Sequence, residues 1–176
     1  MNRIMLVDDE KNILSSLRRA LRNEHWEIEC FTSATEALKR AEVSNFELFI
    51  SDFRMPEMNG VEFLTAVKQL QPQSMRLILS GYTDLEALLG AINDAEIYRF
   101  LSKPWQDYEL ISTVEQALHF RKLAIENQRL ADQVRRQESK LCQQEMVLQK
   151  LEKESPGITK VNWTEDGSII LNEDDI

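Results

Sequence analysis

Cysteine and long apolar segments are both scarce in this sequence. Its 176 residues include only two cysteines, Cys30 and Cys142, which lie far apart without a metal-binding spacing. We therefore expect free thiols in a reducing compartment. No apolar run approaches the roughly 18 residues that span a bilayer, and the opening MNRIMLVDDE reaches acidic residues too early for a signal peptide. These absences predict a cytoplasmic protein with no membrane contact.

Positive charge is also in short supply. The chain carries 21 Lys and Arg against 30 Asp and Glu, which gives a net charge of −9. No basic patch stands out, so we expect no direct binding of nucleic acid. The two histidines, His25 and His119, lack a plausible nucleophile partner. Their isolation disfavours a hydrolase that works through a catalytic triad.

The first 110 residues or so alternate between short apolar segments and amphipathic helical patterns. This alternation is typical of βαβ units and a parallel sheet with helices on both faces. Five such units predict a doubly wound α/β fold of the flavodoxin-like (βα)5 type with strand order 2-1-3-4-5. The predicted strands are 3–7, 26–31, 46–51, 75–80 and 98–101, and the predicted helices between them are 10–22, 34–43, 59–69 and 83–93.

Charged or polar side chains follow four of the predicted strands. Asp8 and Asp9 follow the first strand, Asp52 follows the third, Ser80 ends the fourth and Lys103 comes shortly after the fifth. In the order 2-1-3-4-5, these strand ends are neighbours at one edge of the sheet, where ligands bind in such folds. One aspartate after a strand is usually a helix cap or a turn residue. A polar group at each neighbouring strand end instead predicts a functional site.

The predicted cluster suits phosphoryl transfer to a carboxylate. Clustered carboxylates repel one another, which raises the pKa of at least one of them. A Mg²⁺ ion relieves this repulsion and also binds phosphate oxygens. An aspartate can be the nucleophile that forms an aspartyl phosphate, while Lys103 would supply positive charge and Ser80 a hydroxyl group for the phosphoryl oxygens.

The motifs VDDE, ISDFRMPEMNG, ILSGYTD and YRFLSKPW together resemble the receiver domain of two-component response regulators, over about residues 1–120. The resemblance implies that Asp52 is the phospho-acceptor. It also implies that Asp9 binds Mg²⁺ directly while Asp8 acts largely through water. Asp52 and the backbone carbonyl of Arg54 would complete the protein ligands of the metal.

The same resemblance assigns a switch to the site. It implies that Ser80 is the switch hydroxyl, that Tyr98 is the switch aromatic residue, and that Lys103 is the family's lysine, joined to Pro104 by a cis peptide bond. The longer run SGYTDLEALLGAINDAEIYRFLSKPW resembles receivers of the hydrogenase-regulator type and those fused to HD-GYP phosphodiesterase domains. Tyr82 and Trp105 belong to this resemblance; we interpret Trp105 as a packing anchor.

The loop after the predicted acceptor has its own pattern. Pro56 restricts Met55 to extended geometry, which stiffens the loop. Asn59-Gly60 supplies a turn that can enter the left-handed region before the next helix. Ordinary turn chemistry explains both pairs equally well. Arg54, two residues after the predicted acceptor, either tunes hydrolysis or faces solvent.

Residues 107–154 contain neither proline nor glycine. They predict one helix of about 48 residues and about 70 Å, which is long enough to suggest a coiled coil. Asn127 occupies an a position, where a buried Asn favours two strands in register, and Lys140 of one helix can pair with Glu145 of the other. We therefore predict a parallel homodimer; an antiparallel or larger bundle and a solvated helix remain alternatives. The a positions are Phe120, Asn127, Val134, Leu141 and Leu148, and the d positions are Leu123, Leu130, Gln137, Gln144 and Leu151.

A short tail, residues 155–176, follows the predicted helix. Pro156-Gly157 ends the helix, and Asp166-Gly167 is a turn signal between two β-rich runs. We therefore predict a hairpin with an acidic end, in which Trp163 and Ile169-Ile170 make the apolar contacts. Because an isolated hairpin is marginal in water, a disordered tail is the alternative.

Together, these patterns predict a phospho-accepting response regulator rather than an enzyme. A histidine kinase would be the phosphodonor, and a protein partner of unknown identity would receive the output. One alternative is a constitutive dimeric scaffold whose receiver is only structural. Another is a phosphatase of the haloacid dehalogenase type; it is disfavoured because such enzymes place an Asp-x-Asp motif after the first strand, where this sequence has adjacent Asp8 and Asp9.

Overall fold

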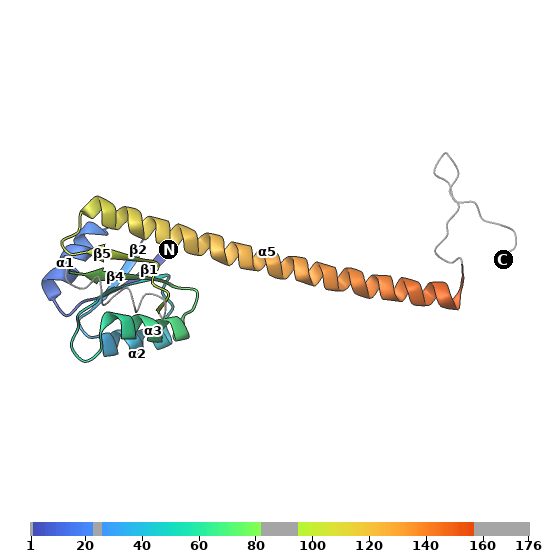
Figure 1. Cartoon of the computed structure of the whole chain (residues 1–176), viewed down its shortest axis with the longest axis horizontal. Helices are drawn as coiled ribbons and strands as arrows, with labels where there is room; N and C mark the ends of the chain where they lie inside the picture. Colours follow the sequence, from blue (N-terminus) through green and yellow to red (C-terminus); the bar gives the residue numbers. More distant parts are fainter. Residues whose placement is uncertain (1, 23–25, 82–94, 157–176) are drawn as a thin grey trace. The chain divides into compact units, whose positions relative to one another are not determined.

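The structure, a computed structural model, describes residues 2–22, 26–81 and 95–156 (Figure 1). The predicted helix at 83–93 and the predicted hairpin around Asp166-Gly167 lie outside these residues. The elements in chain order are β1 (Asn2–Val7), α1 (Lys11–Ala20), β2 (Trp26–Phe31), α2 (Ala34–Val43), β3 (Leu48–Asp52), α3 (Gly60–Leu70), β4 (Met75–Ser80), β5 (Arg99–Ser102) and α5 (Asp107–Glu154).

The five strands form one parallel sheet of order β2-β1-β3-β4-β5, which confirms the predicted flavodoxin-like fold. The third strand begins two residues later than predicted, at Leu48, and ends on Asp52. The backbone N–H of Phe46 donates to the side chain of Gln71 at 2.8 Å instead of to a neighbouring strand. This side-chain bond keeps Phe46 in the loop before β3.

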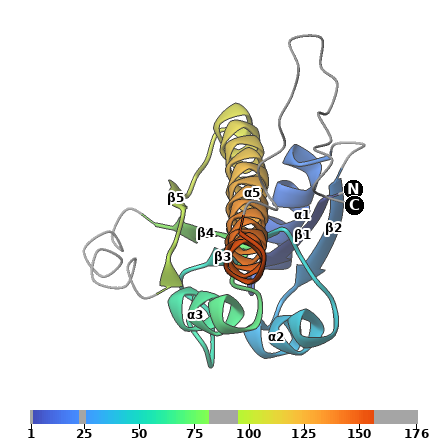
Figure 2. The same cartoon turned by 90° about the vertical axis from the view of Figure 1, so that its right-hand side faces the viewer.

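Helices cover both faces of the sheet, as the uninterrupted apolar strands indicate. Within β1, Ile4 and Leu6 pack with α1 and the first part of α5, while Met5 and Val7 pack with α2 and α3. Figure 2 shows α2 and α3 together on one side of the strands. This alternation in β1 follows from the two-residue period of a strand.

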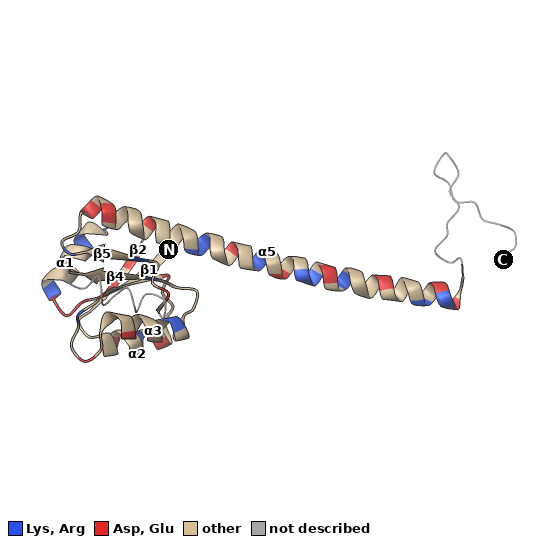
Figure 3. Cartoon of the chain, in the orientation of Figure 1, with Lys and Arg blue, Asp and Glu red and all other residues tan. Residues whose placement is uncertain are grey.

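Helix α5 spans Asp107–Glu154, as predicted, and is the longest element. Its buried residues, Leu110, Thr113, Val114 and Ala117, all lie in its first three turns. Large apolar side chains are exposed further along, at Phe120, Leu123, Leu130, Val134, Leu141, Met146, Val147, Leu148 and Leu151. Figure 3 shows residues of both charge signs along the same helix.

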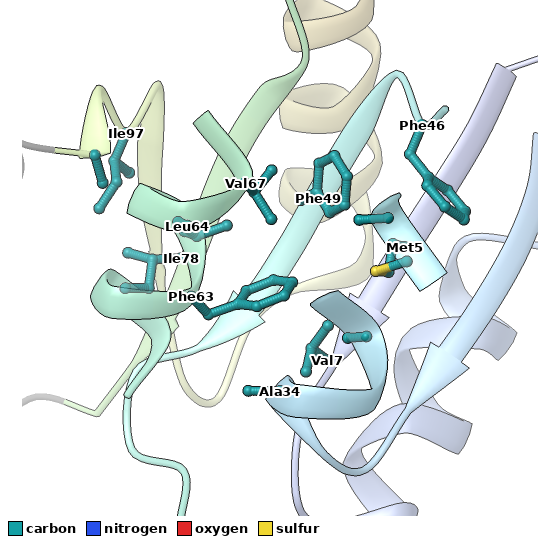
Figure 4. Close-up of a cluster of buried hydrophobic side chains, with 13 residues drawn as sticks. Met5, Val7, Ala34, Phe46, Phe49, Phe63, Leu64, Val67, Ile78 and Ile97 are labelled. Atoms are coloured by element: carbon teal, nitrogen blue, oxygen red, sulfur yellow. The ribbon is translucent and has the colours of Figure 1, made fainter. Parts of the chain in front are cut away.

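The chain divides into two compact units, residues 1–126 and 127–176. In the first unit, three phenylalanines form the centre of the cluster under α2 and α3 (Figure 4). The rings of Phe46, Phe49 and Phe63 meet edge to face, with centroids 5.6 and 6.2 Å apart. Burying each phenylalanine contributes roughly 1.5–3 kcal/mol, so the middle of the sheet is a rigid support for the strand ends.

No helix of the described ranges has the length and apolar character to cross a membrane.

Candidate functional site

Two carboxylates and one ammonium group meet at the carboxyl edge of the sheet. Asp8 follows β1, Asp52 ends β3 and Lys103 follows β5. The Nζ of Lys103 lies 2.7 Å from Oδ2 of Asp8 and 2.5 Å from Oδ1 of Asp52. Asp8 is 0% exposed and Asp52 is 6% exposed. The strand order thus brings together residues that lie 95 positions apart in the chain.

Burial and hydrogen bonding have opposite effects on the pKa of Asp8 and on that of Lys103, and a different effect dominates at each group. Burial raises the pKa of the Asp8 carboxyl, and hydrogen bonds from Lys103 and from the Glu10 backbone offset only part of this effect. Burial also lowers the pKa of Lys103, but its hydrogen bonds to Asp52 and Asp8 outweigh this, so that its pKa is raised. The pKa values of the paired Asp8 and Lys103 therefore both rise, because burial dominates at the acid and pairing at the base. Lys103 is thus the common partner of two buried carboxyl groups.

Backbone groups hold both carboxylates in place. The N–H of Arg54 donates to Oδ2 of Asp52, and the N–H of Glu10 donates to Oδ1 of Asp8, both at 2.9 Å. Each aspartate therefore accepts a bond from the residue two positions later, as in an Asx turn. The fixed side chains leave little rotamer freedom at the site, which favours a preorganised acceptor.

Gly60 allows α3 to approach the backbone of Asp52. Its N–H donates to the carbonyl of Phe53 at 2.9 Å, and a Cβ at this position would lie 2.0 Å from the carbonyl oxygen of Asp52. The expected left-handed turn at Asn59-Gly60 is wrong. Asn59 has a φ of −72° and caps α3 in a capping box with Glu62, and its neighbour is a glycine because of close packing.

The segment after β5 is also tied to the site. The N–H of Lys103 donates to the carbonyl of Ser80 at 2.8 Å. The Lys103–Pro104 peptide bond is cis, as the family resemblance implied. Trp105 packs against the cluster that includes α1 and α5, which confirms the interpretation of this residue as a packing anchor. Tyr82 lies outside the described residues.

The remaining predicted site residues occupy different surroundings. Ser80 is buried at the end of β4, next to the strand that carries Asp52. Asp9 and Arg54 are exposed. Within the described ranges, no three His, Cys, Asp or Glu side chains are placed so as to hold a metal ion together. In the structure, Asp8 and Asp52 therefore both form ion pairs with Lys103, and Asp9 is not part of this group.

Tyr98 and Phe100 have different surroundings, because Phe100 lies within β5 whereas Tyr98 immediately precedes it. Ile78 pairs with Phe100 and Ser80 pairs with Ser102, so that Phe100 shares a face with Ser80. Phe100 is 41% exposed. Tyr98 instead packs against the cluster on the other face, and its ring centroid lies 5.7 Å from that of Phe120. Counting back in twos from Ser102 reaches both Phe100 and Tyr98, so the strand period alone does not separate these two rings; the contact of Tyr98 with Phe120 does.

The geometry is that of a flavodoxin-like domain with an acidic site at the carboxyl edge of its sheet. The response regulator receiver domain family matches residues 4–115. The hydrogenase transcriptional regulatory protein HoxA of Bradyrhizobium diazoefficiens is 39% identical over 125 residues, which is 71% of this chain and 26% of that protein. HoxA of Cupriavidus necator is 41% identical over 118 residues, or 65% of this chain and 24% of that protein.

Solved structures give the same result. The signal receiver domain of an HD domain-containing protein from Pseudomonas fluorescens Pf-5 superposes with a TM-score of 0.67 and 36% identity, covering 71% of this chain and 92% of that chain. An uncharacterized protein from Neptuniibacter caesariensis superposes with a TM-score of 0.68 and 42% identity, covering 72% and 93%. The chain belongs to the response regulator receiver domain family of two-component systems. It spans about a quarter of the length of the HoxA proteins.

Membership of the family defines the general role. Receiver domains are regulatory, histidine kinases phosphorylate them, and Mg²⁺ binding is typical of them. The donor set of this chain fits such an ion, because Asp8 and Asp52 offer carboxylate oxygens, which Mg²⁺ prefers. The two oxygens already share one positive charge, that of Lys103.

Proposed function

We propose that this chain is a phospho-accepting response regulator in which Asp52 receives a phosphoryl group from a histidine kinase. The single observation that carries the proposal is the buried Asp52 carboxylate, which ends β3 and shares Lys103 with Asp8. A carboxylate oxygen of Asp52 forms the new P–O bond while the P–N bond to the donor histidine breaks and its electron pair returns to the imidazole. Lys103 stabilises the charge of the transferred group.

Mg²⁺ is the proposed cofactor, with ligands from Asp8, Asp9, Asp52 and the backbone carbonyl of Arg54. The carboxylate donors and the clustered negative charge support this set. The ion would neutralise charge on the phosphoryl oxygens. Asp9 is exposed beside the buried Asp8, so its carboxylate is accessible from solvent.

The switch is proposed to use Ser80 and one aromatic residue, either Tyr98 or Phe100. Phe100 has the advantage that it shares a sheet face with Ser80, whereas Tyr98 packs on α5. Replacing each ring separately by leucine distinguishes them. Only the switch residue should change the response of the protein to beryllofluoride, a phosphoryl mimic, without changing the labelling of Asp52.

The proposed output is a protein–protein contact made in the cytoplasm through a parallel homodimer. In this reading residues 1–120 are the receiver, 107–154 form the coiled coil, and 155–176 form the tail. The row of exposed apolar side chains on α5 supports the dimer, and the free cysteines Cys30 and Cys142 are compatible with a reducing compartment. A constitutive dimer with a purely structural receiver is the competing description.

The deciding experiment labels the full chain with acetyl phosphate in the presence and absence of Mg²⁺. We expect stoichiometric, Mg²⁺-dependent labelling of the natural chain and none of Asp52→Asn, because only the carboxylate is a nucleophile. Asp9→Asn serves as a control with the same loss of charge; it should raise the Mg²⁺ concentration needed for labelling without moving the label. Full labelling of the Asp52 variant would refute the assignment. Steady turnover of a small phosphate ester would favour the phosphatase alternative.

A second candidate function is control of transcription. The names of the relatives favour it: both HoxA proteins are hydrogenase transcriptional regulatory proteins, and a relative from Proteus hauseri, 29% identical over 119 residues, is the DNA-binding transcriptional regulator NtrC. The acidic net charge of this chain argues against direct contact with DNA. A salt titration of binding to duplex DNA tests this candidate, because phosphate contacts give a steep salt dependence.

A further inference from the structure

Arg121 of α5 makes contact with the amino end of the strand that carries Asp52. Its Nε donates to the backbone carbonyl of Gln73 at 2.9 Å, and its terminal guanidinium nitrogen lies 4.0 Å from a carboxylate oxygen of Glu47. Glu47 immediately precedes β3, and Gln73 lies in the loop before β4. We call Arg121, Glu47 and Gln73 the junction clamp.

The clamp is partly buried and is built into the sheet. The side chains of Arg121 and Glu47 are only 23% and 22% exposed. The carboxylate of Glu47 accepts from the N–H of Arg3 at 2.6 Å, and its backbone carbonyl accepts from the N–H of Met75 at 2.9 Å. Glu47 is thus tied to β1 and β4 as well as to α5, and its position cannot change independently of the sheet.

The clamp lies at the start of the apolar row on α5. Phe120, the first predicted a position, precedes Arg121, and its ring packs against Tyr98 next to β5. Two consecutive residues therefore fix α5 against two different parts of the receiver. Between Glu47 and Asp52, β3 is buried at every position, so the clamp and the acceptor are the two ends of one rigid element.

We propose that Arg121 is a positioning residue that couples the Asp52 end of β3 to the coiled coil. This inference rests on the proposed function. Arg121 holds Phe120 and the following turn of α5 in one orientation. A structural change caused by the added charge at Asp52 is thereby transmitted through β3 to the helix pair. Without the clamp, α5 keeps its helix and its core contacts, but its orientation beyond Ala117 no longer follows the state of the sheet.

An arginine suits this position better than a lysine. Its planar guanidinium donates Nε–H to a carbonyl while a terminal nitrogen forms an ion pair with a carboxylate at 4.0 Å. A lysine ammonium at the same place can satisfy one of these groups fully but not both. Arg121→Lys should therefore restore part of the coupling that Arg121→Gln removes.

The test measures disulfide formation across the helix pair in the full chain. Val134→Cys, at an a position, is introduced with Cys142→Ser, and the cross-linking rate is compared with and without beryllofluoride. We expect the ratio of these rates to differ from one by roughly fivefold or more, the lower range of allosteric couplings. In Arg121→Gln the ratio of the two cross-linking rates should be close to one, while the labelling of Asp52 is unchanged. With Arg121→Lys it should be intermediate.

Two further variants make the result specific. Lys122→Gln removes one positive charge from the next residue and should leave the ratio as in the parent. Glu47→Gln keeps an acceptor for the N–H of Arg3 but removes the charge that faces Arg121; because Arg121 keeps its bond to Gln73, the ratio should be intermediate. A parent-like ratio in Arg121→Gln would overturn the inference alone. A ratio of one in the parent would overturn both the inference and the coil output, whereas labelling of Asp52 tests the proposed acceptor separately.

Discussion

At the scale of single residues, Lys103 determines whether the site can exist. It is the counter-ion of Asp8, which is fully buried, and of Asp52, which is nearly so. Removing one partner of a buried pair leaves an uncompensated charge, which commonly costs about 3–5 kcal/mol. The site therefore depends on the cis-linked segment after β5 as much as on the aspartates.

Gly60 gives a prediction at the same scale. Gly60→Ala should lower the free energy of unfolding by about 1–3 kcal/mol, the usual cost of overpacking, because the new Cβ would meet the carbonyl oxygen of Asp52 at 2.0 Å. It should also slow the labelling of Asp52, since the backbone of the acceptor must move. Urea denaturation and labelling kinetics measure the two effects.

The neighbouring cap provides the control. Asn59→Ala removes the capping box of α3 and should cost about 0.5–2 kcal/mol, but it leaves the labelling rate near that of the natural chain. Equal labelling rates in the Gly60 and Asn59 variants would show that the close approach has no functional role.

The meeting of Asp8, Asp52 and Lys103 could be predicted from the sequence, because the strand order brings these strand ends together whatever the details of the side chains. The close packing at Gly60 could not be predicted, because Asn-Gly is a typical turn sequence. Only the position of α3 in the structure shows the close approach to Asp52. The different surroundings of Tyr98 and Phe100 were also hidden, because they depend on where β5 begins. That start, Arg99, is one residue later than predicted.

At the scale of elements, the edge strand β2 is held by a group of charges. Glu29 of β2 accepts from Arg40 of α2 at 2.8 and 3.1 Å and from Arg3 of β1 at 2.5 Å. The hydrogen bond from Arg40 lowers the pKa of Glu29, burial opposes it, and the bond from Arg3 adds to the lowering. These contacts attach the edge strand to its neighbouring strand and to a helix.

A pH dependence follows from this group. Because the pKa of Glu29 is lower in the folded than in the unfolded protein, its contribution to stability is present above the unfolded value, near 4.5, and is lost as pH falls through the folded value. Glu29→Gln should therefore reduce stability at pH 7 by on the order of 0.5–1 kcal/mol, with a smaller difference below that window. Denaturation curves across pH measure this. Glu27→Gln, which removes a more exposed partner of Arg3, should have less effect, and a pH-independent difference would contradict the assignment.

The boundaries of a helix or strand could be predicted where residues nearby in sequence determine them. They could not be predicted where a side chain distant in sequence determines them. The long helix α5 could be given from Asp107 to Glu154 because no proline or glycine interrupts it. The start of β3 could not, since Gln71 in another loop competes for the N–H of Phe46. Secondary structure alone carries no information about such a bond.

At the scale of the whole molecule, the exposed apolar row on α5 predicts a partner helix. Its members are exposed in the described part of the single chain, and seven of the nine, all but Met146 and Val147, occupy a or d positions of the predicted heptads. We expect a species of about twice the 20.5 kDa chain mass in sedimentation equilibrium. Glutamates at both Leu130 and Leu141 should shift it to the monomer mass, because they place charge in the seam.

The matched control adds the same two charges elsewhere on the helix. Gln128→Glu with Gln149→Glu, both at b positions outside the seam, should leave the dimer mass unchanged. Labelling of Asp52 should be normal in both double variants, since neither touches the carboxyl edge of the sheet. A monomer mass for the natural chain would rule out the seam.

The exposed row on α5 also links the folding of the second unit to the amount of protein present. A solitary helix without packing is only marginally stable, whereas association stabilises it by mass action. If the proposed dimer forms, the helix beyond the receiver should be fully stable only above the dissociation constant of the pair. The number of copies in a cell would then act as a second input, alongside phosphate, to whatever this helix pair controls.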